Sequence, residues 1–355
     1  MMSLYSYPKI SRFKFPVTVH NIFTTNRIAN QALITQPKGA IMNSIFTRRT
    51  VLLSVAAMVC STLPIFAETN AKTAAEIRVV VWDERQEAQK TAYPNYLGNY
   101  IAEQLTSAGG FKVTSVGLND PNQGLTSELL DNTDVLVWWG HQKHGEVKDE
   151  LAMDIVKRVQ TGKLALVALH SAHFSKPFTL LMDARTLEDV NRSLTPDERK
   201  KAKIVTHPGP RRTMKPTEAK TPNWTKIVQA DGSITVDVVL PGCAFFTVHA
   251  EGLPSHIATM LPKHAIAKGI PANFTIPHTE VYGGVFQVPT PDAVIFGEKW
   301  DTGEEFTAGC LWKVGKGRVF YYRPGHETFQ VFQQKENITI VENAIRYVAP
   351  KSNKY

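Results

Sequence analysis

Residues 164–173 read LALVALHSAH, an apolar run that ends directly on His170 and His173. A run that is apolar at every position predicts a strand buried on both faces, which is typical of a parallel sheet covered by helices on each side. Polar residues that follow such a strand lie at its carboxyl end, where open α/β sheets bind their ligands. The segment therefore predicts an α/β fold and the place of a site.

The sequence before residue 164 alternates apolar strands with amphipathic helices. Because strands alternate with helices, we expect a flavodoxin-like α/β fold, a mostly parallel sheet with right-handed crossovers and helices on both faces. The predicted strands are Ile77–Trp82, Lys112–Val116, Asp134–Trp139 and Leu164–Leu169, and the predicted helices are Tyr96–Ser107, Ser127–Asp131 and Glu146–Thr161.

Residues 183–232 interrupt this alternation of strands and helices. They hold a charged run over Asp197–Lys203 and a stretch rich in proline and basic residues over His207–Pro222, and we expect an inserted excursion over the surface. Regular structure then resumes. The later predicted strands are Ile234–Leu240, Val294–Phe296, Gly309–Lys313 and Arg318–Tyr322, and the last predicted helix is Asn337–Val348.

Nearly all of the net charge of +8 comes from residues 1–67. Residues 1–67 carry seven basic and no acidic residues, so the remainder holds 33 basic and 32 acidic residues. A nucleic-acid surface needs clustered basic residues that displace counterions. We therefore expect no nucleic-acid partner, and no nucleotide cofactor.

Residues 1–67 are predicted to be an export leader, with a signal peptide over about 42–67. Arg48 and Arg49 precede the mostly apolar run Val51–Val59, and Ala67 offers a small residue at a cleavage point. The paired arginines indicate twin-arginine export, so we expect a periplasmic or secreted protein with no stable membrane insertion after cleavage. An uncleaved anchor is the alternative. Residues 68–350 then form one domain and 351–355 a short tail.

Two cysteines, Cys243 and Cys310, remain beyond the leader. Export permits a disulfide between them, and two buried thiols are equally consistent with the sequence.

Histidines and glutamates gather in four short segments, each of which is expected to follow a strand. The segments are Gly140–Glu146, His170–His173, His278–Gly284 and Arg323–Glu327. Because the carboxyl ends of parallel strands share one edge of the sheet, these side chains are expected to converge. A single histidine in such a segment is more often a structural residue than a ligand. The two H-x-x-H pairs indicate a site only because both are expected at strand ends.

Two kinds of role suit these residues. The candidate catalytic groups are His141, His144, His173, Tyr282, His326 and Glu327. The candidate metal ligands are His170 and Glu280, with His144 or His326 as possible further ligands of a divalent ion such as zinc or manganese.

The motifs at these segments resemble the ThuA-like (trehalose utilization) family. They are Val137–His141, Leu169–Lys176, Glu280–Gly283 and Phe320–Glu327, and the resemblance covers about Ile77 to Pro350, with a departure between Met182 and Lys263. The resemblance implies a class I glutamine amidotransferase-like fold. His170 stands nearest the place of the amidotransferase cysteine, so no thioester and no glutaminase activity are expected.

The same resemblance implies a carbohydrate ligand, trehalose or another disaccharide, and action on an oxidised (keto) sugar. If the protein is an enzyme, we expect a keto-sugar isomerase or a lyase-type enzyme. Isomerisation of a keto sugar needs a base beside the carbonyl and an acid or a metal to hold the enediolate. Trp138, Trp139 and Tyr282 are candidates to stack on sugar rings, although one of the two tryptophans is expected to face the core.

Two alternatives stay open. A non-catalytic periplasmic sugar-binding protein would use the same residues without turnover. A serine hydrolase would use Ser171, but the segment around it lacks the glycine-flanked elbow of that chemistry. The sequence is also compatible with a homo-oligomer.

Overall fold

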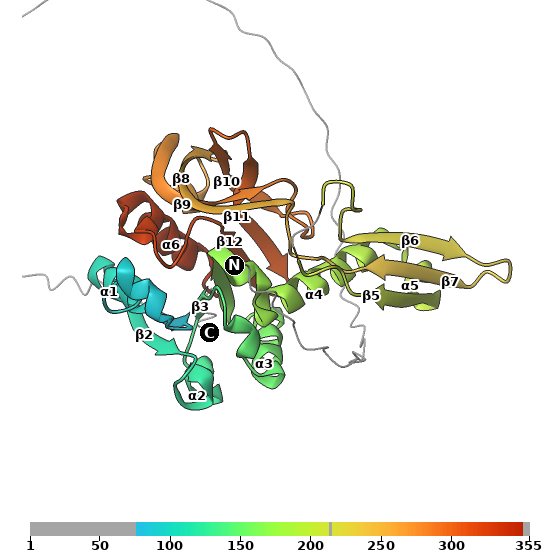
Figure 1. Cartoon of the computed structure of the whole chain (residues 1–355). Coiled ribbons are helices and arrows are strands. Elements are labelled where there is room, and N and C mark those ends of the chain that lie inside the picture. The colour runs from blue at the N-terminus through green and yellow to red at the C-terminus, as the bar shows by residue number, and fades with distance from the viewer. Residues whose placement is uncertain (1–75, 213–214, 351–355) are drawn as a thin grey trace, which may run out of the picture. The chain divides into compact units, whose positions relative to one another are not determined.

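The computed structural model describes residues 76–212 and 215–350, and these are built around one nine-stranded sheet (Figure 1). The strand order is β2-β1-β3-β4-β12-β11-β10-β8-β9. The first five strands of this order are parallel: β1 (Ile77–Asp83), β2 (Phe111–Gly117), β3 (Val135–Trp139), β4 (Ala165–Leu169) and β12 (Gly317–Tyr322). The predicted α/β fold with a parallel core is confirmed. The predicted leader and tail lie outside the described residues.

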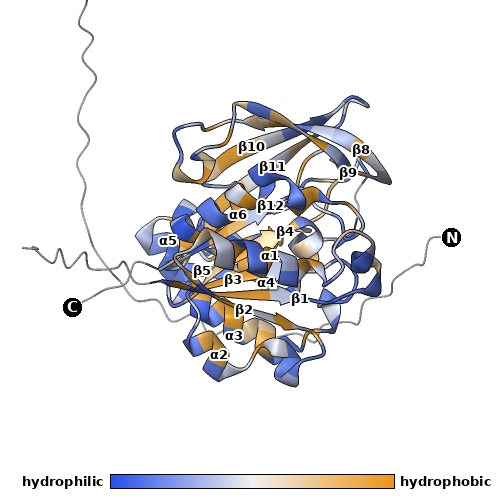
Figure 2. Ribbon diagram, turned by 90° about the vertical axis from the view of Figure 1, so that its left-hand side faces the viewer, coloured by the Kyte–Doolittle hydropathy of each residue, from blue (hydrophilic) through white to orange (hydrophobic). Residues whose placement is uncertain are grey.

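Helices cover both faces of the parallel strands. One face packs against α1 (Leu97–Ala108) and α6 (Lys335–Val348), and the other against α3 (Asp149–Gln160) and α4 (Lys176–Ser193), with the short α2 (Ser127–Asp131) beside them. All five residues of β3 and of β4 are buried, because alternate side chains enter the two cores. Figure 2 shows these central strands in orange and much of the outer helix surface in blue.

Four antiparallel strands extend the sheet beyond β12. They are β11 (Glu305–Val314), β10 (Ala293–Trp300), β8 (Thr247–Thr259) and β9 (Asn273–Gly283). The sequence predicted β10, β11 and β12 but not β8 or β9. The third polar segment, His278–Gly284, was expected to follow a strand, and this was wrong because most of it lies within β9.

The predicted excursion over 183–232 contains regular structure. α4 continues to Ser193, and α5 (Pro196–Lys201) follows behind a capping box made by Thr195 and Glu198. A small second sheet of order β5-β7-β6 comes next, formed by β5 (Ala202–His207), β6 (Asn223–Val228) and β7 (Ile234–Val239). This sheet lies beyond the end of α4 in Figure 1 and has a small core of its own.

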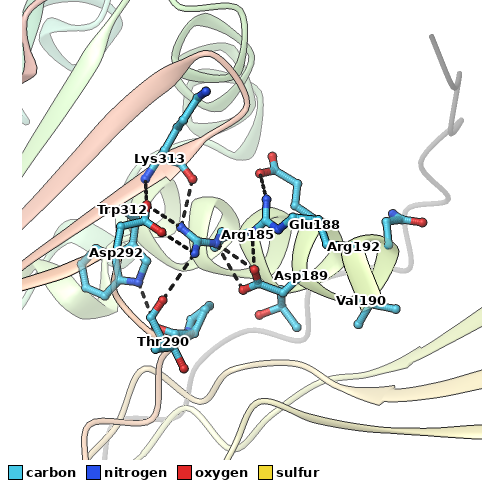
Figure 3. A network of polar contacts seen from close by, with 12 residues as sticks. Arg185, Glu188, Asp189, Val190, Arg192, Thr290, Asp292, Trp312 and Lys313 are labelled. Carbon is cyan, nitrogen blue, oxygen red and sulfur yellow. Dashed lines mark hydrogen bonds and ion pairs between the residues drawn. The ribbon is translucent and has the colours of Figure 1, made fainter. Parts of the chain in front are cut away.

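Arg185 holds α4 against the antiparallel part of the main sheet (Figure 3). Its guanidinium pairs with Asp189 one turn along the helix and with Asp292 just before β10, and it also donates to the carbonyl oxygen of Lys313 in β11. The side chain is buried, so the network ties α4 to two distant parts of the chain.

Cys243 and Cys310 are both free and buried, so the disulfide alternative was wrong. Among the described residues, no helix is both long enough and apolar enough to cross a membrane.

Candidate functional site

Three neighbouring parallel strands end beside one another and deliver four of the predicted side chains to one edge. His141 follows β3, His170 follows β4, and His326 and Glu327 follow β12. Glu280 joins them from within β9. We refer to His141, His170, Glu280, His326 and Glu327 as the carboxyl-edge cluster.

His170 stands at a sharp turn where β4 ends. Its φ of 51° lies in the left-handed region, which a residue other than glycine rarely adopts. Gly325 passes so close that a Cβ there would lie 2.5 Å from the Cβ of His170, so this contact requires glycine. The strained turn projects the imidazole over the sheet edge, where it stacks on Trp139 with a centroid distance of 5.4 Å.

The tautomer of His170 follows from its hydrogen bond. Nδ1 lies 3.1 Å from the carbonyl oxygen of Arg323, which can only accept, so Nδ1 carries the proton. Nε2 therefore keeps a lone pair, and it faces Glu280 Oε2 at 3.1 Å. Neither Nε2 nor Oε2 has a hydrogen-bond partner within the described residues, and both atoms are buried.

Burial shapes the charge of this pair. Desolvation, helped by the nearby basic groups His141, His326 and Arg323, lowers the pKa of His170 well below its ordinary value. Desolvation raises the pKa of Glu280, and the same basic groups oppose this shift. Two facing acceptors repel each other unless a proton or a cation lies between them, so this corner of the cluster has a place for a positive charge.

His141 and Glu327 form a second pair beside the first. His141 Nδ1 lies 2.5 Å from Glu327 Oε2, which leaves Nε2 of His141 free of that bond. Burial opposes ionisation of both groups, but their hydrogen bond and mutual attraction prevail. The pKa of His141 is raised and that of Glu327 falls to about 2.

His326 lies against both pairs. Its ring centroid is 5.2 Å from that of His141 and 6.0 Å from that of His170. Nδ1 lies 2.9 Å from the hydroxyl oxygen of Thr328 and accepts the backbone N–H of Thr328 at 3.3 Å, so the neutral ring carries its proton on Nε2. Burial lowers the pKa of His326. Its side chain is 13% exposed and that of His141 22%, whereas His170 is fully buried, so solvent reaches the cluster through these two rings.

The second histidine of each H-x-x-H pair lies apart from the cluster. His173 donates from Nδ1 to the carbonyl oxygen of Cys243 at 2.6 Å and is enclosed by aromatic rings of the core. His144 is buried beneath Gly140, and burial lowers its pKa to about 3. Neither ring reaches a substrate in this arrangement, because both are shielded from solvent.

The predicted stacking residues are also buried. Trp138 and Trp139 have no exposed surface, and Trp138 stacks on Trp82 instead. Tyr282 is 2% exposed, and its hydroxyl bonds to Ser171 Oγ at 2.9 Å. One of the two tryptophans was expected to face the core, and both do, because alternate residues of β3 fill the two cores.

Sequence reasoning missed the groups that hold the cluster in place. Arg323 and Glu298 form a fully buried ion pair, and Arg323 also donates to the carbonyl oxygen of Glu280 at 2.6 Å. Glu84 accepts the backbone N–H groups of Gln142 and Lys143 at 2.8 and 2.7 Å and so fixes the turn that carries His141. Because Glu84 follows the first predicted strand, its place at a strand end could have marked it as a residue of the site.

Two overlapping sets of side chains have the spacing of metal ligands: His141, His170 and Glu280, and His141, His326 and Glu327. In the second set, the Glu327 oxygen nearest to His141 is already hydrogen-bonded to it. The first set contains the two unpartnered atoms, and each of its imidazoles has its other nitrogen held by a carboxylate or a carbonyl oxygen. Such outer partners are typical of histidines that bind metals, so the first set fits a divalent cation better.

A comparison with models of protein families shows which family the chain belongs to. Residues 78–348 match the model of the ThuA family, described as trehalose utilisation. The chain belongs to the ThuA family. A search of curated proteins finds no significant match. The family assignment confirms the resemblance that the sequence motifs indicated.

Solved structures similar to this ThuA chain include two ThuA-like proteins. The one from Bacteroides uniformis is 13% identical, with a TM-score of 0.48, over 79% of this chain and 94% of that one. The one from Parabacteroides merdae is 14% identical, with a TM-score of 0.49, over 79% and 93%. A GMP synthase protein from Thermoplasma acidophilum is 10% identical, with a TM-score of 0.38, over 76% and 93%. At these scores the family assignment rests on the family model alone.

Proposed function

We propose that this ThuA protein is an enzyme of carbohydrate metabolism that transfers a proton on an oxidised (keto) disaccharide, with a divalent cation held by His141, His170 and Glu280. The observation that carries the proposal is the buried pair of facing acceptors, His170 Nε2 and Glu280 Oε2, 3.1 Å apart without hydrogen-bond partners. Nδ1 of His144 and Nε2 of His173 are also buried without a partner, but His170 is the histidine whose unpartnered nitrogen faces an unpartnered carboxylate oxygen. Leaving both groups of such a buried pair without a partner is costly.

The cation would be zinc or manganese, since both accept imidazole and carboxylate ligands. A bound cation polarises a carbonyl group and stabilises the enediolate formed when the neighbouring carbon loses its proton. His141 suits this site because Glu327 fixes its ring and makes the imidazole a better ligand.

His326 is the group proposed to donate to the substrate carbonyl oxygen. Its Nδ1 accepts the backbone N–H of Thr328 at 3.3 Å, so the neutral ring carries its proton on Nε2. Burial keeps its pKa below the ordinary histidine value, so the ring is mostly neutral near pH 7 and can polarise the carbonyl by donating from Nε2. Its partial exposure gives the substrate access.

The serine hydrolase is the weaker alternative. Ser171 Oγ bonds to the Tyr282 hydroxyl, and burial raises the pKa of Tyr282 well above its ordinary value, so this partner is not a base. A nucleophilic serine requires an adjacent base to take its proton. A non-catalytic sugar-binding protein is the other alternative, and the test below separates it from the enzyme.

Incubating residues 68–355 with zinc or manganese and a keto form of trehalose in D₂O tests the proposal. Proton NMR should show deuterium entering at the carbon beside the carbonyl, with formation of an isomer. His326→Gln should slow the exchange by about 10²–10⁴-fold, the usual contribution of a positioned acid–base group. His256→Gln, which alters an exposed histidine on β8, should not. Binding without exchange would identify a sugar-binding protein instead.

Export to the periplasm or beyond is proposed from the leader sequence alone. The paired arginines Arg48 and Arg49 and the apolar run Val51–Val59 support a twin-arginine signal peptide over about 42–67.

A further inference from the structure

A basic hollow lies at the opposite end of β12 from the carboxyl-edge cluster. It has a volume of about 640 Å³ and is lined by Ala265, Lys268, Gly269, Arg318, Asn343, Arg346 and Tyr347. Arg318 is the second residue of β12, whereas the cluster follows its last. With a rise of about 3.3 Å per residue, the strand separates the hollow from the cluster by roughly 16 Å.

Three cations line this hollow, and no carboxylate does. Within residues 76–212 and 215–350, neither Lys268 nor Arg318 nor Arg346 forms a salt bridge, although most other arginines described there do. Glu342 acts on Arg346 electrostatically from one turn earlier on α6. The hollow therefore carries an excess of positive charge, which an anion would balance.

The two guanidinium groups are held in place by rings and carbonyl oxygens. Arg346 lies over Phe111 with 4.0 Å to the ring centroid and donates to the carbonyl oxygen of Gly109 at 2.9 Å. Arg318 lies over Tyr347 with 5.4 Å to the centroid. Each guanidinium has five N–H donors, so these contacts orient the group and leave donors for a ligand.

The hollow's floor is also fixed. The amide of Asn343 donates to the carbonyl oxygens of Ile266 and Lys268 at 3.1 and 2.8 Å, which ties the Lys268 turn to α6. One feature opposes an anion: the hollow lies at the carboxyl end of α6, which carries a partial charge of about −0.5. Three full positive charges outweigh it.

We infer that this hollow binds a compact oxyanion, a phosphate or carboxylate group of a small molecule, at a site separate from the carboxyl-edge cluster. The inference does not depend on the proposed function. Arg318 and Arg346 would supply paired N–H donors, and Lys268 a mobile point charge.

Calorimetric titration of the purified protein with inorganic phosphate, and separately with citrate, tests the inference. Saturable binding of either anion, weakened by added sodium chloride, is expected, and the stronger of the two identifies the ligand group. Arg318→Gln should weaken it roughly tenfold, the effect of losing one charge-assisted hydrogen bond. Lys335→Gln, which removes an exposed cation from the other end of α6, should leave it unchanged.

Lys268→Gln protects the test against a folding defect, because the Lys268 side chain is exposed and its loss should not unfold the protein. This variant should bind several-fold more weakly with an unchanged melting temperature. Absence of saturable binding of both anions, or equal binding by wild type, Lys268→Gln and Arg318→Gln, would overturn the inference.

Discussion

At the scale of single residues, the site depends on which nitrogen of each imidazole keeps its lone pair. His170 donates from Nδ1 to a carbonyl oxygen and His141 directs Nδ1 to Glu327, so Nε2 of each ring is left for a further partner. Ligand atoms of His141, His170 and Glu280 lie within 4.8 Å of one another. The strained φ of His170 and the close approach of Gly325 show that the backbone turns sharply where it places this imidazole.

The ion pair between Arg323 and Glu298 is fully buried, so its loss should be costly. Glu298→Gln should lower the free energy of unfolding by about 3–5 kcal/mol, because it leaves the fully buried Arg323 charge without its partner. Urea denaturation would measure this. Glu305→Gln, at an exposed pair with Lys299, should change the stability by less than about 0.5 kcal/mol. Equal effects would contradict the proposed importance of burial.

The His141–Glu327 pair predicts a pH dependence in metal-free protein. The pKa of Glu327 is depressed, so its contribution to stability is present above the ordinary glutamate pKa and is lost as pH falls toward 2. The pKa of His141 is raised, so its contribution is complete below the ordinary histidine pKa and is lost as pH rises through the folded value. The stability difference between wild type and Glu327→Gln should therefore be largest near pH 5–6. A difference that keeps growing above pH 8 would exclude this pairing.

At the scale of elements, Arg185 ties α4 to the antiparallel strands. Arg185→Met should destabilise the protein by about 2–3 kcal/mol, because the buried guanidinium holds Asp189, Asp292 and a β11 carbonyl oxygen together. Arg192→Met, on the same helix and 57% exposed, should cost less than about 0.5 kcal/mol. Thermal unfolding of the two variants compares them directly, and a similar loss in both would mean that the network in Figure 3 is not what holds α4.

The elements that sequence patterns predicted are those with an uninterrupted period. β3 and β4 are apolar at every position and α3 repeats its apolar residues regularly, so each was found within a few residues of its bounds. β8 and β9 were missed because Gly252, Pro254 and Pro277 break the alternation, and the pairing of these strands shifts register around them. Glu280 was still identified, from its motif and not from its strand.

The candidate site, like the fold, could be predicted only where its residues follow strands with an uninterrupted apolar pattern. His141, His170, His326 and Glu327 follow parallel strands, so their convergence could be predicted from position. His144 and His173 follow the same strands but turn back into the protein, and no feature of the H-x-x-H spacing distinguishes the two directions. The Arg323–Glu298 pair was missed because it joins β10 to the residue after β12, 25 positions apart, and depends on how the antiparallel strands pack.

At the scale of the whole molecule, the leader and the folded part should be separable. Replacing Arg48 and Arg49 with lysine should block export while leaving the folded part intact, because twin-arginine signals depend on the arginine pair. Cell fractionation, with amino-terminal sequencing of the exported form, checks this and should give a start near residue 68. Unchanged export of the double-lysine variant would argue for a different route.

The central claim is that His141, His170 and Glu280 hold a divalent cation, and elemental analysis of the protein purified without chelator tests it most directly. We predict about one zinc or manganese ion per chain, lost in Glu280→Gln and retained in Glu304→Gln, whose carboxylate pairs with His249 and belongs to neither ligand set. Wild-type protein without a divalent ion after supply of both metals, or equal metal in the two variants, would contradict it.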